Sequence, residues 1–330
     1  MENIRVEILG AESFGVRSMC TAVRTPDVSL LLDPGCALGP RREHEIPHPE
    51  EYKALHAITD RIVSASQGCT GIFISHYHHD HFKPRLVDEV YIHAGDEIAV
   101  PLYLNHDLYL KAGGKALGTN QRNRCRDFRY SMGRVARVLH DADFTRYRFG
   151  DTIVDFSPPV PHGEQGTKLG HIVMARIRHG ADCFVFAPDV QGPVVEDTVK
   201  FMLDVPPAMA FLGGPPYYLG EKLTRFQFEA AEANLARLHE RVPVLVVDHH
   251  CCRDRGAFQA MIERVSGCTD GTNQVTGNVI ESAAGFMGVE PAFLESDRVQ
   301  LYTDQPPSTA FLDWIALPRE RRLATIPPTG

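Results

Sequence analysis

Short runs of apolar residues, each closed by polar or turn-forming residues, recur along this chain. They lie at residues 4–9, 20–24, 29–32, 72–74, 98–104, 152–156, 183–187 and 244–247, with a further strand end in 211–219. Runs of this length with such boundaries are typical of buried β-strands. The pattern therefore predicts a protein built on β-sheet, with polar loops that leave the ends of the strands.

Helical spacing appears between and after these runs. It is clearest at residues 226–242, where apolar side chains fall on one stripe. Helices are also predicted up to about residue 65, from 83 to 90, and over much of 256–296, with 257–265 and 282–294 as the clearest pieces. We predict a single domain over residues 1–330, in which residues 256–330 form a mostly helical C-terminal extension packed on the rest.

The most informative stretch is GIFISHYHHDH at residues 71–81. An apolar run ends at Ser75, and His76, His78, Asp80 and His81 follow in the pattern HxHxDH. A lone histidine is usually a packed or surface residue, but three imidazoles and a carboxylate within six residues suit a borderline metal such as zinc. The motif therefore predicts a metal site in the loop that leaves this strand.

Other runs deliver candidate ligands in the same way. Asp33 follows residues 29–32 in a Pro-Gly turn, His162 follows 152–156, Asp189 follows 183–187, and His249 with His250 follows 244–247. Each residue alone could be a turn-capping or surface group. Together they indicate that several strands carry polar side chains to one edge of the sheet structure.

The composition argues against a nucleic-acid-binding protein, a membrane protein and a secreted protein. The 330 residues are 43% hydrophobic, enough to bury a sizeable core, and the net charge is −8. This acidic balance argues against a surface coated in basic charge for nucleic acid or an anionic membrane. The N-terminal residues show no apolar segment typical of a signal peptide, and no run approaches the ~20 apolar residues that cross a bilayer. With eight cysteines and no CxxC pair, we expect reduced thiols in a cytoplasmic protein with no membrane association.

One region departs from the acidic balance. Eight arginines lie between residues 122 and 148, at positions 122, 124, 126, 129, 134, 137, 146 and 148. Such a run is most often a solvated face. The alternative is an anion-binding flap over the metal site, for a phosphate or carboxylate of the substrate.

These residues resemble the metallo-β-lactamase-fold superfamily. HYHHDH matches its HxHxDH signature, LLLDPG its upstream aspartate, and His162, Asp189 and His249 its later ligands in order. The segments ESFGVRSMCTAVRTPDVSLLLDPG, GPRR, IPHPEE and GGPPYYLG are similar to a branch of predicted metal-dependent hydrolases within it. The resemblance implies a four-layer αββα sandwich, with two sheets face to face, helices outside, and a metal site at one rim.

The resemblance also implies a ligand set for two divalent metal ions. His76, His78 and His162 would hold the first ion, Asp80, His81 and His249 the second, and Asp189 would bridge them. His249 and His250 both remain candidates for the last position. We prefer His249, with His250 and Asp33 as outer partners, Asp33 orienting a ligand imidazole. Members of the fold that use iron for oxidation typically carry Glu where this chain has His78, which favours zinc and hydrolysis, although iron and manganese stay open.

This inventory predicts a hydrolase. Two metal ions can share a water, lower its pKa and hold it as a bridging hydroxide, with Asp80 as a ligand that also orients this nucleophile. The substrate would be a small molecule with an ester, lactone, thioester or phosphoester bond. The first alternative is a nuclease or phosphodiesterase that uses the arginines of 122–148. The second alternative is a non-catalytic scaffold that the metal stabilises.

Overall fold

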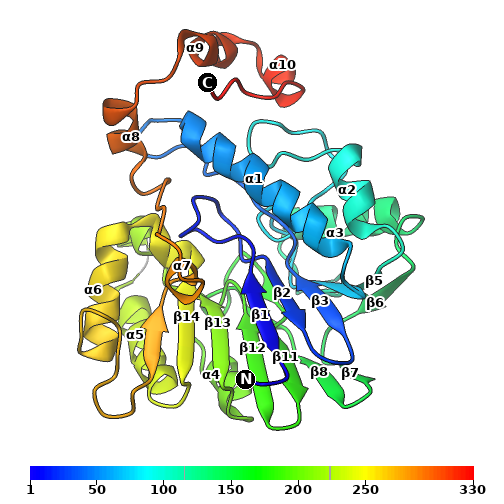
Figure 1. Ribbon diagram of the computed structural model, residues 1–330, viewed down its shortest axis with the longest axis vertical. Coiled ribbons are helices and arrows are strands. Elements are labelled where there is room, and N and C mark those ends of the chain that lie inside the picture. The colour runs from blue at the N-terminus through cyan, green and yellow to red at the C-terminus, as the bar shows by residue number, and fades with distance from the viewer. Residues whose placement is uncertain (115, 223) are drawn as a thin grey trace.

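The computed structural model describes residues 1–114, 116–222 and 224–330 and contains two β-sheets that face each other (Figure 1). The first sheet has six strands in the order β1 to β6. β1 to β3 are antiparallel, and β3 to β6 are parallel. The strands are β1 (Arg5–Ile8), β2 (Thr21–Arg24), β3 (Ser29–Leu32), β4 (Gly71–Ile74), β5 (Asp107–Leu110) and β6 (Val138–Asp141).

The second sheet has seven strands in the order β15-β14-β13-β12-β11-β8-β7. β7, β8, β11 and β12 pair antiparallel, whereas β12 to β15 pair parallel. The strands are β7 (Arg146–Phe149), β8 (Thr152–Phe156), β11 (Ala175–His179), β12 (Asp182–Ala187), β13 (Met209–Gly213), β14 (Val244–Asp248) and β15 (Val279–Glu281), and β9 (Val160–Pro161) with β10 (His171–Ile172) forms a separate ribbon.

Helices cover the outer face of each sheet (Figure 1). Apolar side chains of α1, α2 and α3 pack on the first sheet, and those of α4, α5 and α6 pack on the second. A third apolar layer lies between the sheets, where the rings of Phe73 and Phe156 stack at 4.6 Å. The helices are α1 (Pro49–Ser66), α2 (Asp96–Tyr103), α3 (Thr119–Met132), α4 (Glu196–Leu203), α5 (Arg225–His239) and α6 (Arg255–Ser266). The expected four-layer αββα sandwich is confirmed.

The direction of the strands explains where the polar loops lie. β3 and β4 run parallel, so their carboxyl ends share one edge of the first sheet. In the second sheet β11 runs antiparallel to both β8 and β12, so β8 and β12 end at the same edge as β14. All five strands therefore release their loops on the same rim, where the predicted ligands follow.

Three sequence predictions of secondary structure are wrong. Residues 98–104 form not a strand but most of α2, because a short apolar run with buried Ile98, Ala99 and Leu102 also fits a helix face. Residues 83–90 are irregular, since the Asp88 carboxylate accepts the backbone N–H groups of Val90 and Tyr91 and closes a turn. Within 282–294 only the short α7 (Ala283–Phe286) is helical.

The C-terminal residues reach both halves of the sandwich. After α6, β15 adds an edge strand parallel to β14, and α8 (Arg298–Asp304), α9 (Thr309–Ala316) and α10 (Arg319–Leu323) then pass over α1 (Figure 1). The fully buried Arg298 pairs with Glu51 of α1 at 2.7 Å, and Trp314 packs edge-on against Tyr52.

Within the described residues, we find no helix whose length and apolar character would let it span a membrane.

Candidate metal centre

The loop after β4 is fixed by the loop after β3. The carboxylate of Asp33 accepts the backbone N–H of Ser75 at 2.7 Å, its hydroxyl at 2.6 Å, and the Nδ1–H of His81 at 2.7 Å. Gly35 lets the two loops touch, because a Cβ there would overlap the backbone of His81 and Phe82. The Pro-Gly turn thus permits a close approach as well as a change of direction.

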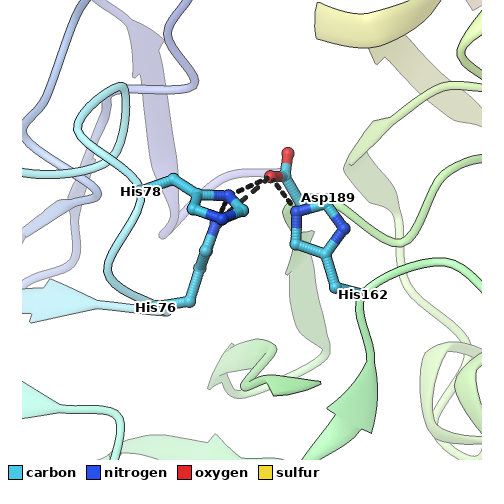
Figure 2. A group of neighbouring side chains, drawn as sticks. All are labelled: His76, His78, His162 and Asp189. Carbon is cyan, nitrogen blue, oxygen red and sulfur yellow. Dashed lines mark hydrogen bonds and ion pairs between the residues drawn. The ribbon is translucent and has the colours of Figure 1, made fainter. Parts of the chain in front are cut away.

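The two loops of the first sheet meet the loops of the second at Asp189. One carboxylate oxygen, Oδ2, lies 2.7 Å from His162 Nε2, 3.1 Å from His76 Nε2 and 3.7 Å from His78 Nδ1. Figure 2 shows the three imidazoles converging on this oxygen from two directions. These are the residues predicted to share the first ion, and one ligand atom from each of the four lies within 4.8 Å of the others.

The other oxygen of Asp189 faces a second group. Oδ1 lies 3.2 Å from His249 Nε2 and 3.4 Å from His250 Nε2. His249 Nε2 is also 3.5 Å from Asp80 Oδ2. His81 Nε2 lies between the two groups, 4.0 Å from Asp80 Oδ1 and 3.4 Å from Asp189 Oδ2. The structure therefore brings all seven predicted ligands together, and the choice between His249 and His250 stays a prediction.

The buried polar atoms of this cluster fit a cation. Both oxygens of Asp189 and the Nε2 atoms of His81, His162 and His250 are buried without a hydrogen-bond partner. Unpaired buried groups are costly, so a cluster of them needs an explanation. Imidazole nitrogen and carboxylate oxygen are the ligands that zinc and related ions take. We conclude that the residues present fit bound divalent ions.

Electrostatics set the ionisation states of the buried donors. Burial alone would raise the pKa of Asp189, but the surrounding imidazoles, led by His81, hold this pKa well below its usual range. Burial, with the neighbouring His81, lowers the pKa of His76 well below its usual value, so this imidazole is neutral. For His81, burial is outweighed by Asp189 and Asp33, and its pKa is raised well above its usual value, so this ring would release a proton when it binds an ion.

The Asp33–His81 contact fixes a tautomer. With Nδ1–H donating to the Asp33 carboxylate, the ring of His81 turns its Nε2 toward Asp80 and Asp189, and this nitrogen would bind an ion once it has lost its proton. This arrangement of carboxylate, imidazole and metal is common around zinc. Asp33 therefore lies where an outer partner of the metal ligands was predicted. The sequence suggested this position, and the structure adds the contact with His81.

Several residues of the centre were missed in the sequence. Arg253 is buried, donates to Glu12 at 3.0 Å, and places its Nη2 3.3 Å from His249 Nε2 and 3.8 Å from Asp80. Arg253 lies four residues after His249, within the short helix η2 (His249–Arg253), and that spacing was its only signal. Asp248 also went unrecognised, although its carboxylate accepts the backbone N–H groups of Ser13 and His249.

The centre opens to solvent on one side. The side chains of His78 and Asp80 are 25% and 16% exposed, whereas that of Asp189 is 1% exposed. A hollow of about 220 Å³ adjoins His78 and is lined by residues 118–121 and 168–169. A ligand would therefore approach past the start of α3.

Four of the eight arginines of 122–148 form ion pairs with aspartates. Arg129 pairs with Asp141, Arg137 with Asp107 and Arg146 with Asp155. Arg124 contacts the motif, donating to the backbone oxygen of Tyr77 at 3.2 Å. These pairs are typical of a solvated face, and the anion-binding flap of residues 122–148 stays a prediction.

A larger cavity lies away from the centre. It has a volume of about 710 Å³, on the side of the second sheet covered by α4, and is lined in part by Asp155, Arg176, Lys200 and Phe201. None of the seven predicted ligands lines it. Its lining contains three cations, Arg146, Arg176 and Lys200, and three carboxylates, Asp155, Asp197 and Asp204, so the charges of its wall balance.

Comparison with known proteins places the chain among relatives of similar length. It is 35% identical over 299 residues to the UPF0282 protein MK0213 of Methanopyrus kandleri, covering 90% of this chain and 99% of that one. It is 34% identical over 310 residues to a UPF0282 protein of Pyrobaculum arsenaticum, covering 91% and 95%. No protein-family model matches the chain.

Solved structures with a similar chain path include the metallo-β-lactamase fold protein YhfI from Bacillus subtilis. The TM-score is 0.46 at 11% identity, covering 84% of this chain and 96% of that one. Unliganded yeast PDE1 gives a TM-score of 0.43 at 13% identity, covering 75% and 88%. Scores of this size carry no argument about chemistry, so the fold described above rests on the observed layers and topology.

Proposed function

Since the chain belongs to the UPF0282 family and gathers seven candidate ligands at one rim of its sandwich, we propose that it is a metal-dependent hydrolase with a dinuclear centre. The observation that carries the proposal is the carboxylate of Asp189. One oxygen, Oδ2, faces His162 at 2.7 Å and also His81 at 3.4 Å, and the other, Oδ1, faces His249 at 3.2 Å. A carboxylate so placed is suited to bridge two cations.

Bound divalent ions would supply a Lewis acid and lower the pKa of a water at the centre. The protein's contribution is to hold the ligands rigidly and to keep bulk water out. Asp189, His76 and His81 are almost wholly buried, and Asp33 fixes the ring of His81. Such preorganised groups need little rearrangement during the reaction.

Asp80 has a different position from the other carboxylates of the centre. Its side chain reaches the opening, while Asp189, Asp33 and Glu12 are buried. A nucleophilic water entering from the His78 side would pass this carboxylate, so we assign Asp80 the task of orienting it. Burial would raise the pKa of Asp80, but His81 and His249 hold it well below its usual range, so the group is an acceptor at neutral pH.

The charges near Asp80 favour an anionic substrate. Arg253 Nη2 lies 3.8 Å from Asp80 Oδ2, and the guanidinium of Arg124 contacts the motif loop near the opening. Guanidinium groups bind carboxylates and phosphates and stabilise negative charge that develops during reaction. We therefore propose a small anionic substrate with an ester, lactone, thioester or phosphoester bond.

The test combines metal analysis with a hydrolysis screen. Zinc-loaded protein is assayed against phosphodiesters, lactones and thioesters, together with Asp80→Asn measured at saturating zinc. We expect turnover by the wild type and a loss of about 10²–10⁴-fold in kcat for the variant, the range for a positioned acid or base. Asp127→Asn, an exposed change, serves as the matched control.

The other outcomes separate the alternatives. A protein that binds zinc, unfolds when His78 is replaced, and turns over no member of the panel would be the metal-stabilised scaffold. Activity confined to RNA or DNA, and lost at high salt, would instead identify a nuclease. An Asp80→Asn variant with unchanged kcat would remove Asp80 from the proposed role.

A further inference from the structure

A second group of metal-type side chains lies outside the centre described above. His56 comes from α1, and Glu89 and His93 come from the irregular segment between β4 and α2. One ligand atom of each lies within 4.8 Å of the others. None of the three contacts Asp189 or belongs to the seven ligands assigned there.

We propose that His56, Glu89 and His93 form a separate binding site for one divalent ion of the zinc class. Two imidazoles and a carboxylate are a donor set that zinc uses, and three protein ligands leave one position for a water. The site would join α1 to the segment of residues 83–95. It is independent of the hydrolase proposal.

The atomic contacts repeat those seen around Asp189. His93 Nδ1 lies 2.5 Å from Glu89 Oε2, as His162 Nε2 lies 2.7 Å from Asp189. The rings of His56 and His93 are 4.1 Å apart, and His56 Nε2 is buried without a hydrogen-bond partner.

The segment that supplies two of the donors is held in a defined shape. Asp88 and Ala94 form a backbone bridge that closes the turn containing Glu89 and His93. His93 itself has a left-handed backbone, with φ of 40°, a conformation that carries strain in a residue other than glycine. A turn closed in this way presents Glu89 and His93 together, so the donors are positioned before any ion binds.

The nearby ammonium of Lys83 does not compete for the donors. Lys83 is fully buried, and its Nζ donates to the backbone oxygens of Cys36, Ile92 and His93. An ammonium has three donors, and these three carbonyls use them all. Lys83 thus supports the backbone of His93 and leaves the side chains of His56 and Glu89 to face each other.

Zinc counting in a variant without the main centre tests the proposal. Asp189→Ala combined with His76→Ala and His81→Ala leaves no more than two neighbouring ligands for either predicted ion of the main centre, and this parent is stripped with chelator, reloaded with Zn²⁺ and analysed for metal. We expect about one ion per chain in the parent, a stoichiometry that is lost when His56→Ala is added. His44→Asn is the matched control, because His44 is an exposed histidine outside both clusters with a left-handed backbone that Asn tolerates.

A second variant and a second readout cover a failure of His56→Ala to fold. Glu89→Gln keeps the volume and removes the charge, and it should lower zinc affinity at least about tenfold. Zinc should also slow hydrogen exchange of the amides of residues 83–95 in the parent but not in Glu89→Gln. A parent that binds no zinc, or a Glu89→Gln variant that binds it as the parent does, would overturn the proposal.

Discussion

Replacing Asp189 by Asn tests the core of the proposed centre with a minimal change of shape. The side chain is 1% exposed, and Asn keeps its volume while removing the charge. In the wild type, Asp189 lies within 3.7 Å of an imidazole nitrogen from each of six histidines, namely His76, His78, His81, His162, His249 and His250. An amide offers one neutral oxygen to this ring of donors, so it cannot serve both groups.

The size of the effect follows from the expected loss of zinc affinity. Loss of an outer partner of a metal ligand typically weakens binding 10–100-fold, so loss of a direct bridging ligand should cost at least about 100-fold, or ~2.7 kcal/mol. At a zinc concentration 1,000 times the wild-type Kd, binding stabilises the folded state by ~4.1 kcal/mol, and in the variant by ~1.4 kcal/mol. For a chain of this size the difference corresponds to a Tm shift smaller by roughly 5 °C.

The assay is thermal unfolding of each protein with zinc and with chelator, together with metal analysis. Because each protein is compared with its own metal-free form, any effect of the substitution on metal-free stability cancels. Asp60→Asn, an exposed change on α1, is the control and should keep the full shift. An Asp189→Asn protein that binds two ions and gains the full Tm shift would refute the bridging role.

Three further changes test other parts of the structure. Asp33→Asn should weaken zinc affinity about 10–100-fold in a competition titration, because His81 loses the charged acceptor that fixes its tautomer. Glu51→Gln leaves the buried Arg298 without its carboxylate and should lower the free energy of unfolding in urea by about 3–5 kcal/mol. The double variant Glu51→Leu with Arg298→Met should recover most of this free energy, and equal losses in the single and double variants would contradict the pairing. Burial would raise the pKa of Asp155, but neighbouring arginines lower it, so its charge stabilises the fold above the ordinary carboxyl pKa of about 3.9, and this contribution is lost as pH falls through the lowered pKa. Asp155→Asn should therefore cost about 1 kcal/mol at pH 7 and progressively less as the pH falls below the ordinary carboxyl pKa of about 3.9, and a gap that does not change with pH would count against this reasoning.

The sequence could predict the rim of the sandwich because strand ends carry a local signal. An apolar run that stops at Asp33, at His76 or at Asp189 shows both the strand and the polar group that follows it. The resemblance to a known family then led to the prediction of the αββα sandwich and of the order of the ligands along the chain. What the runs could not show is which strands are neighbours, since pairing between β8, β11 and β12 depends on contacts far apart in the chain.

Other features were beyond the reach of local patterns. Residues 98–104 were predicted as a strand because a short apolar run fits either state, and packing of α2 against α1 decides for the helix. Arg253 and Glu12 lie 241 residues apart, so their contact beside His249 leaves no trace in composition or spacing. The site of His56, Glu89 and His93 was missed for the same reason, because one donor lies on α1 and two in an irregular turn.

Backbone strain gives an independent argument that the centre has a role beyond stability. Asp33, Asp189 and His249 have left-handed backbones, with φ of 45°, 50° and 67°, each just past the end of β3, β12 or β14. This conformation costs roughly 1–2 kcal/mol per residue other than glycine, and Asp and His are among the side chains that tolerate it best. Glycine would remove the cost at all three positions and keep the turns. The chain instead has a carboxylate or an imidazole at each turn, and each of these side chains points to the same cluster. The residue types at the three turns therefore fit the chemistry of the cluster, whereas the geometry of the turns alone would favour glycine.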